Sequence, residues 1–329
     1  MRPISRLRFD SLAGYSRTPW LCLLVDEFGW FEEAGEKVLG VLAFDLSDND
    51  FDVFVLGRDA KGCFRAVALE CSIPTAEEAH ARLEAKLRMY AQRPPEEFFQ
   101  GDETGKPMDF LTPVVKEHVM NSSFRHLISE RGLSPARQLG ELMNYFEDPD
   151  GNFVKDFQTG GFDARVWELY LYALFTELGY GFDRTHPAPD FYCQGPRGEF
   201  FVEATTINPS ANPPTLDDTP RLAYFDNYVP RKFGSVLKSK LDKKILGKRY
   251  WELDHVAGMP LVFAVQDFHA IRAMSWSNTG LVEYLYGIRQ VRRTTADGSS
   301  SIVSEPIKEF VWEERQFPQV FSLNQTRRT

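Results

Sequence analysis

Long apolar runs are missing from this 329-residue sequence. No stretch approaches the roughly 18 consecutive apolar residues that a membrane-spanning helix needs, so we expect no membrane partner. The first residues, MRPISRLRFDSLAGY, carry early arginines but no apolar segment behind them, and this pattern argues against a secretory signal. We therefore expect a cytoplasmic protein.

Cysteine and histidine are also scarce, with four and six residues respectively. The cysteines show neither a C-x-x-C pair nor the spacing of a zinc site, and no two histidines form an H-x-x-x-H pair. So few thiols in a chain of this length do not build a disulfide framework. We expect reduced cysteines and no permanent structural metal.

An excess of basic residues is absent as well. The 38 Lys and Arg residues face 47 Asp and Glu residues, and the formal net charge is -9 at pH 7. Proteins that coat nucleic acid usually have the opposite balance. One segment differs, because Arg231–Arg249 (RKFGSVLKSKLDKKILGKR) contains eight basic residues and one acid. A polyanion would therefore bind at this segment rather than over the whole surface.

The N-terminal part of the chain contains clear strand and helix patterns. Three segments rich in Val, Phe and Leu, KVLGVLAFDL, DFDVFVLG and CFRAVALECSI, are separated by short turn sequences. Such connections predict an antiparallel meander. Thr75 and Glu78 then form a capping box for the helix TAEEAHARLEAKLRMYA. The helix has an apolar face made of Ala79, Leu83, Leu87 and Tyr90.

Changes in composition predict three parts. Pro, Gly, Glu and Gln accumulate between Arg93 and Pro107, which indicates a linker, and residues 109–147 are predicted to be mostly helical. We expect a sheet-plus-helix domain over 1–106 and a helical connector over 107–158. A third domain is expected over 159–329, with a β-rich extension at its C-terminal end.

Carboxylates occur at three notable places in this third domain. Glu168 lies in DARVWELYLYALFTELGY, a predicted helix that is apolar on most of its circumference, so it either meets a partner inside the fold or pairs with Arg165 on a polar stripe. Asp190 follows Pro189 at the expected start of a strand. Glu203 lies on the predicted strand EFFVEATTI, beyond a turn at 195–198. If these two strands form a hairpin, Asp190 and Glu203 converge into an oxygen-only site that suits Mg²⁺.

This order of elements resembles the PD-(D/E)XK nuclease superfamily, which has the restriction-endonuclease-like fold. The resemblance covers residues 160–270, and the matching residues are Glu168, Pro189-Asp190 and Glu203-Ala204-Thr205. A helix expected from about Gly234 to Arg249 and the strand PLVFAVQDF follow in the family's order. The resemblance implies an α/β (α+β) fold with a mixed sheet flanked by helices. It also implies weakly bound Mg²⁺ or Mn²⁺ on Asp190 and Glu203, and DNA as substrate and partner.

The sequence departs from the family at Thr205, which occupies the position of the motif lysine and cannot carry charge. Some relatives move the cation to the following helix, and Lys240 is the candidate here. The alternative is that the lysines of this helix are only a solvated basic face. The basic segment is also the expected contact with nucleic acid, through Arg231, Lys232, Lys238, Lys243, Lys244, Lys248 and Arg249.

Gln266 lies near the end of the last core strand, and the resemblance makes it a further site candidate. Asp267 and His269 are alternatives, with His269 either a proton shuttle or a structural histidine. The expected catalytic set is Glu168, Asp190, Glu203, Lys240 and Gln266.

Three functions follow from these observations. The first is a metal-dependent endonuclease that cleaves DNA, with defence against foreign DNA as the role suggested by analogy. The second is a nuclease-fold module that has lost catalysis and binds DNA or a protein. The third places the chemistry or a sensor in the N-terminal half, which lacks a phosphate loop, a nucleophile elbow and a metal triad. An interaction with a protein partner fits that half better. The sequence is also compatible with a homodimer.

Overall fold

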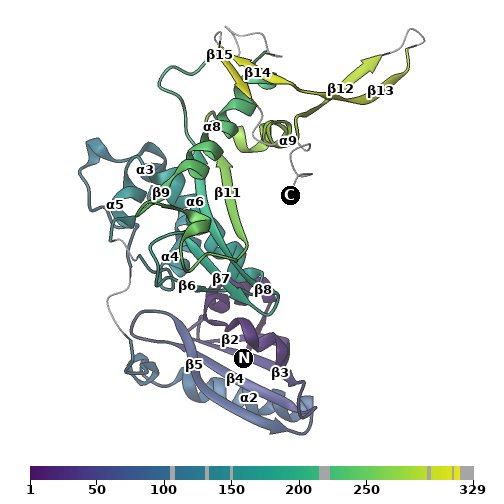
Figure 1. Ribbon diagram of the computed structural model, residues 1–329. Helices are drawn as coiled ribbons and strands as arrows, with labels where there is room; N and C mark the ends of the chain where they lie inside the picture. Colours follow the sequence, from purple (N-terminus) through teal and green to yellow (C-terminus); the bar gives the residue numbers. More distant parts are fainter. Residues whose placement is uncertain are drawn as a thin grey trace. The chain divides into compact units, whose positions relative to one another are not determined.

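The computed structural model describes residues 1–103, 108–129, 133–148, 151–214, 223–294, 298–312 and 315–318 (Figure 1). The fold is of the mixed α+β class, as expected. The chain divides into two compact units, Met1–Phe200 and Phe201–Thr329, and the division falls inside strand β8 (Gly198–Ile207). Among the described residues, no helix combines the length and the apolar character that a membrane span requires.

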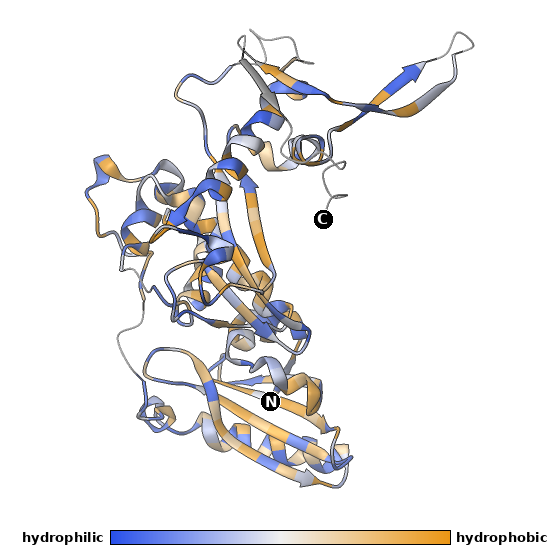
Figure 2. Cartoon of the chain, in the orientation of Figure 1, coloured by the Kyte–Doolittle hydropathy of each residue, from blue (hydrophilic) through white to orange (hydrophobic). Residues whose placement is uncertain are grey.

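The first unit begins with the predicted antiparallel meander, which is confirmed. Its strand order is β1-β2-β3-β4-β5, and each pair is antiparallel. Figure 2 shows the apolar residues along these strands. The strands are β1 (Arg2–Ile4), β2 (Val25–Glu33), β3 (Val38–Asp45), β4 (Phe51–Arg58) and β5 (Phe64–Ile73).

Helix α2 (Ala76–Ala91) follows the sheet and begins where the capping box predicts. The Thr75 hydroxyl oxygen accepts a hydrogen bond from the Glu78 backbone N–H at 3.2 Å. Ala79, Leu83 and Leu87 are fully buried in one cluster with residues of β3 and β4. The helix therefore covers one face of the sheet, because its apolar stripe must be removed from water.

The rest of the first unit is mostly helical. Four phenylalanine rings, from residues 110, 124, 153 and 157, pack together as its core. Its elements are α1 (Arg6–Ala13), α3 (Ser122–Leu127), α4 (Leu133–Met143), α5 (Phe153–Gln158), α6 (Phe162–Glu177), β6 (Gly181–Asp183) and β7 (Phe191–Gly195). Strands β6 and β7 pair antiparallel.

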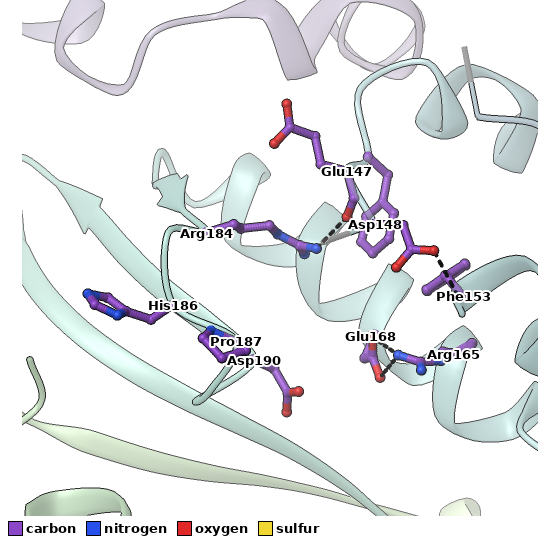
Figure 3. Close-up of a pocket in the computed structure, with 10 residues that line it drawn as sticks. Glu147, Asp148, Phe153, Arg165, Glu168, Arg184, His186, Pro187 and Asp190 are labelled. Atoms are coloured by element: carbon purple, nitrogen blue, oxygen red, sulfur yellow. Dashed lines mark hydrogen bonds and ion pairs between the residues drawn. The ribbon is translucent and has the colours of Figure 1, made fainter. Parts of the chain in front are cut away.

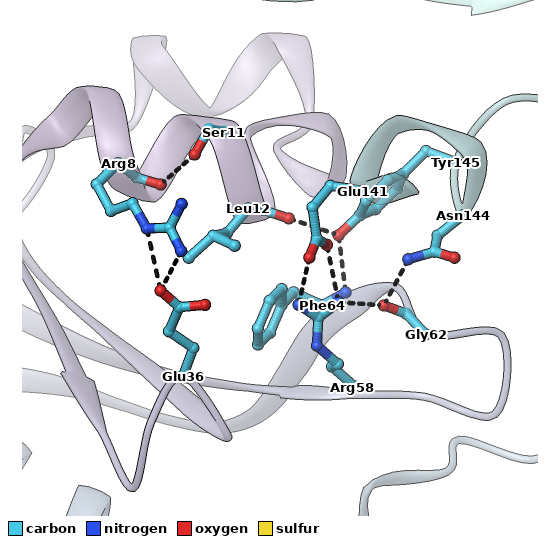
Figure 4. Close-up of polar contacts among 10 residues, drawn as sticks. All are labelled: Arg8, Ser11, Leu12, Glu36, Arg58, Gly62, Phe64, Glu141, Asn144 and Tyr145. Carbon is cyan, nitrogen blue, oxygen red and sulfur yellow. Dashed lines mark hydrogen bonds and ion pairs between the residues drawn. The ribbon is translucent and has the colours of Figure 1, made fainter. Parts of the chain in front are cut away.

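Polar contacts join the N-terminal sheet to helix α4 (Figure 4). The Arg58 guanidinium donates to both carboxylate oxygens of Glu141, at 3.0 and 2.9 Å. The Tyr145 hydroxyl accepts from the Phe64 backbone N–H at 2.7 Å. Bidentate charge-assisted bonds of this kind are strong, which explains why both parts lie in one compact unit. The expected domain boundaries at residues 106 and 158 stay predictions.

The second unit contains the rest of β8, which pairs in parallel with β11 (Leu261–Asp267). Helix α8 (Val229–Asp242) packs on this pair, and Phe233 and Leu237 lie in its core clusters. A single π turn, Tyr224–Tyr228, precedes α8. The remaining elements are α9 (Asn278–Tyr286) and the hairpins β9–β10 (Lys244–Ile245, Lys248–Arg249), β12–β13 (Ile288–Thr294, Ser300–Pro306) and β14–β15 (Glu309–Trp312, Arg315–Pro318).

The expected helix from Gly234 to Arg249 is wrong at both ends. It begins at Val229, because Pro230 suits the first turn of a helix. It ends at Asp242, because Leu246 and Gly247 have φ values of 50° and 84° and form the two-residue turn of the β9–β10 hairpin. Lys244 therefore does not share a helix face with Lys240. The expected linker between Arg93 and Pro107 includes residues 104–107, which lie outside the described residues.

Candidate functional site

Glu203 is the centre of a buried polar cluster in the second unit. Glu203 is only 3% exposed to solvent. Glu203 Oε1 accepts a hydrogen bond from Lys240 Nζ at 2.5 Å and another from the Tyr250 hydroxyl at 2.6 Å. A buried carboxylate is costly unless a cation or hydrogen-bond donors compensate it, and here both are present.

The packing of helix α8 explains why Lys240 reaches Glu203. The register pairs Glu203 with Phe263 of β11, so both side chains lie on one face of the strand pair. Leu237 belongs to the core cluster against which Phe263 packs. Lys240 follows Leu237 by three residues and so projects from the same side of the helix. Its aliphatic stem covers apolar surface, and its ammonium group ends at the carboxylate.

Tyr250 is the member of this cluster that the sequence analysis missed. It lies directly after β10, is fully buried, and has its ring 6.0 Å from the ring of Phe263. A buried tyrosine hydroxyl needs a hydrogen-bond partner, and this general requirement is the only hint of its role that the sequence contains. Nothing local in the sequence identifies that partner as Glu203, which lies 47 residues earlier.

Glu168 and Asp190 line one small pocket in the first unit, with a volume of about 40 Å³ (Figure 3). Glu168 projects from α6, and Asp190 lies directly before β7. One guanidinium nitrogen of Arg165 donates to both oxygens of Glu168 at 3.0 Å, and the other donates to Asp156 at 2.8 Å. The pairing of Glu168 with Arg165, one of the two expected arrangements, is therefore present.

A second arginine, Arg184, also lines this pocket. The Arg184 guanidinium donates to the backbone carbonyl of Glu147 at 2.7 Å and lies over the ring of Phe146 at 4.4 Å. Burial lowers the pKa of Arg184. The pocket therefore combines acidic groups with two arginines. Asp190 belongs to the first unit and Glu203 to the second, so the expected approach of their carboxyl groups stays a prediction.

Gln266 does not join Glu203. The register pairs Gln266 with Thr206, and side chains alternate along a strand, so Gln266 lies on the face opposite to Glu203.

Asp267 and His269 form a separate buried network. His269 Nδ1 lies 2.8 Å from both oxygens of Asp267, and its Nε2 lies 2.9 Å from the Tyr224 hydroxyl. Burial opposes ionisation of Asp267, but hydrogen bonds from His269 and Ser277 outweigh it and lower its pKa. Asp267 pairs with Ile207 of β8. Ile207 lies four residues after Glu203 on that strand, so the two positions are roughly 13 Å apart.

Six of the seven residues expected to contact nucleic acid, all but Lys244, have contacts of two kinds within the chain. Some are engaged with the chain itself: Lys238 with Asp242 at 2.6 Å, Lys248 with Asp254 at 2.6 Å, and Lys232 with the Asn208 carbonyl at 2.7 Å. Others contact aromatic rings: Arg231 over Tyr228, Lys243 over Tyr250 and Arg249 over Trp251. Lys238, Lys243, Lys244, Lys248 and Arg249 are exposed, mainly around the β9–β10 hairpin.

Residues that could hold a metal ion occur elsewhere in the chain. Asp45, Asp50 and Asp52, at the β3–β4 turn, each offer a carboxylate oxygen, and these oxygens lie within 4.8 Å of one another.

No protein-family model matches this chain, and no curated protein or solved structure gives a significant match. Its function has to be inferred from its own side chains.

Proposed function

We propose that this chain is a metal-dependent phosphodiesterase that cleaves DNA, with an active centre of the PD-(D/E)XK kind. The contact between Lys240 Nζ and Glu203 Oε1 is the observation that carries this proposal. The motif strand contains Glu203-Ala204-Thr205 and has threonine where the motif has its lysine. Lys240 brings the missing positive charge to the motif carboxylate from the following helix.

The donor set fits a hard cation. Asp190 and Glu203 offer carboxylate oxygens, and the sequence motif is what links the two residues. They would hold Mg²⁺ or Mn²⁺, which when bound polarises a phosphoryl oxygen and lowers the pKa of water. Lys240 would stabilise the negative charge that grows on the phosphoryl oxygens.

Two further features support the proposal. Glu168 lines the pocket of Asp190, where it would help to orient a water molecule or a metal ligand. The exposed cations around the β9–β10 hairpin would bind the phosphate backbone without reading its sequence. The overall charge of -9 confines such binding to this segment.

The test is cleavage of plasmid DNA with Mg²⁺ or Mn²⁺, at saturating DNA. We expect cleavage that a chelator stops and that Glu203→Gln and Asp190→Asn abolish. Lys240→Ala should reduce the rate at saturating DNA by about 10²-fold or more. Lys238→Ala is the matched control, because Lys238 lies on the same helix but is 69% exposed and pairs with Asp242. It should leave that rate unchanged.

Two outcomes would overturn the proposal. Full cleavage by the Glu203→Gln and Asp190→Asn variants would place the chemistry elsewhere. DNA binding without cleavage under all metal conditions would favour the alternative, a nuclease-fold module that only binds. The Thr205→Lys variant tests the role of Lys240. A gain of cleavage would mean that Lys240 does not supply the positive charge of the missing motif lysine, whereas no gain agrees with Lys240 in that role.

A further inference from the structure

The turn between β3 and β4 gathers acidic side chains in the first unit. Its sequence is Asp45-Leu46-Ser47-Asp48-Asn49-Asp50-Phe51-Asp52. Asp45 ends β3, Asp50 precedes β4, and Asp52 lies on β4 opposite Ala43. The Asp45 N–H donates to the Asp50 carbonyl at 2.9 Å, which holds the two ends of the turn together.

Asp52 carries a buried carboxylate oxygen that has no hydrogen-bond partner among the described residues. The residue is 4% exposed, and this oxygen is its Oδ1. Its carboxylate lies within 4.8 Å of those of Asp45 and Asp50. A buried carboxylate oxygen without a partner is costly, and two neighbouring carboxylates add repulsion.

Backbone N–H groups of Ser47 and Asp48 donate to Asp45 Oδ1 at 2.6 and 3.2 Å, but within the described ranges no Lys or Arg forms an ion pair with any of the three aspartates. A cation at this place would reduce the repulsion among the three carboxylates and would give the buried Asp52 oxygen a partner.

We propose that Asp45, Asp50 and Asp52 bind a hard divalent cation, Ca²⁺ in preference to Mg²⁺, at the β3–β4 turn. The ligand atoms are oxygens, and Ca²⁺ accepts six to eight of them at about 2.4 Å, including carboxylates and turn carbonyls. Oxygens on opposite sides of such an ion lie about 4.8 Å apart, and the three carboxylate oxygens lie within this distance of one another, so only a small approach of the side chains is needed for all three to contact one ion. Mg²⁺ requires a tighter octahedron and keeps its waters. This inference does not depend on the proposed nuclease activity.

Calcium binding to the full chain tests the proposal, measured by equilibrium dialysis and by thermal unfolding after chelator treatment. The Glu203→Gln variant is used as background, so that the proposed nuclease site does not contribute. We expect one Ca²⁺ per chain and a rise in Tm of roughly 5 °C at a hundredfold excess over Kd. Asp50→Asn should weaken binding at least tenfold, because a charged ligand is lost.

Asp48→Asn is the matched control, because Asp48 is an exposed aspartate of the same turn outside the cluster. It should bind Ca²⁺ as the background protein does. Asp52→Asn should raise Tm in the presence of chelator and abolish the Ca²⁺-dependent rise. Absence of a Ca²⁺-dependent rise in the background protein, unchanged binding by Asp50→Asn, or a response to Mg²⁺ alone would overturn the proposal.

Discussion

Single residues decide what the second unit can do chemically. Glu203 is kept buried by two donors of different kinds, the Lys240 ammonium group and the Tyr250 hydroxyl. The lysine supplies charge, and the tyrosine supplies a neutral hydrogen bond from a fixed ring. Because both donate to the same oxygen, loss of either leaves the carboxylate under-compensated.

The Lys240–Glu203 pair should be visible in stability as well as in activity. Lys240→Ala leaves a buried carboxylate without its cation, so we expect a loss of about 2 kcal/mol in the free energy of unfolding. Glu203→Gln removes the charge, so the double variant should lose less than the sum of the two single variants. Chemical denaturation of the four proteins gives this coupling energy. Additive effects would contradict the contact, and exposed Lys238→Ala should change stability by less than about 0.5 kcal/mol.

Helix α8 positions Lys240 by packing closely against helix α9. A Cβ atom added at Gly234 of α8 would lie 2.2 Å from the Tyr284 ring of α9, and one added at Gly280 of α9 would lie 2.6 Å from Val229. The two helices therefore approach each other through reciprocal glycines. The cluster that contains Leu237, Tyr284 and Phe310 depends on this approach.

Gly234→Ala should destabilise the protein even though alanine is the better helix former. We expect a loss of about 1–3 kcal/mol, because the methyl group forces Tyr284 or the helix to move. Gly140→Ala in helix α4 is the matched control, since no atom lies within 4 Å of its added Cβ. That change should gain up to about 1 kcal/mol from helix propensity alone. Thermal unfolding of both variants checks the contrast, and equal effects would show that the close approach is not present.

The β9–β10 hairpin presents the basic segment to solvent. Lys244→Ala should weaken binding to duplex DNA and reduce the log–log dependence of affinity on salt by about one unit, if Lys244 contacts one phosphate. Fluorescence anisotropy between 50 and 200 mM salt, with chelator present to prevent cleavage, measures this slope. Lys86→Ala is a control in the first unit, because Lys86 pairs with Glu70 at 2.8 Å. An unchanged slope for Lys244→Ala would exclude the hairpin from the DNA contact.

At the scale of the whole molecule, acidic groups held by internal donors occur in both units. In the first unit, burial of Glu27 is outweighed by hydrogen bonds and charge from Arg17, so its pKa is lowered. In the second unit, the donors around Asp267 have the same effect. The folded state of either unit therefore binds protons at these groups less readily than the unfolded chain does.

Stability should therefore decrease in acid. A carboxylate with a lowered pKa contributes stability that is fully present above its ordinary value, about 4, and is lost as the pH falls through the folded-state value. Glu27→Gln and Asp267→Asn should each lower Tm at pH 7, and the difference from the parent protein should shrink below about pH 4. Thermal unfolding between pH 3 and pH 7 measures this difference. A deficit that stays constant with pH would show that the lost contacts are not charge-dependent.

Local patterns in the sequence determined the N-terminal meander, the start of helix α2 and the strand that carries Glu203. Alternation, helical periodicity and capping act over a few residues, so they can be recognised without knowing the fold. Lys240 was also among the candidates, because the missing motif lysine directed attention to the next helix.

Only the tertiary structure decided which of these residues meet. It brought Tyr250 to Glu203, turned Gln266 to the opposite face, and ended helix α8 before Lys244. It also brought the carboxylates of Asp45, Asp50 and Asp52 together at the β3–β4 turn and buried an oxygen of Asp52 there. The contacts with Glu203 join residues 37 and 47 positions apart. Such contacts depend on strand register, helix packing and burial, which the whole chain sets together and no short segment encodes.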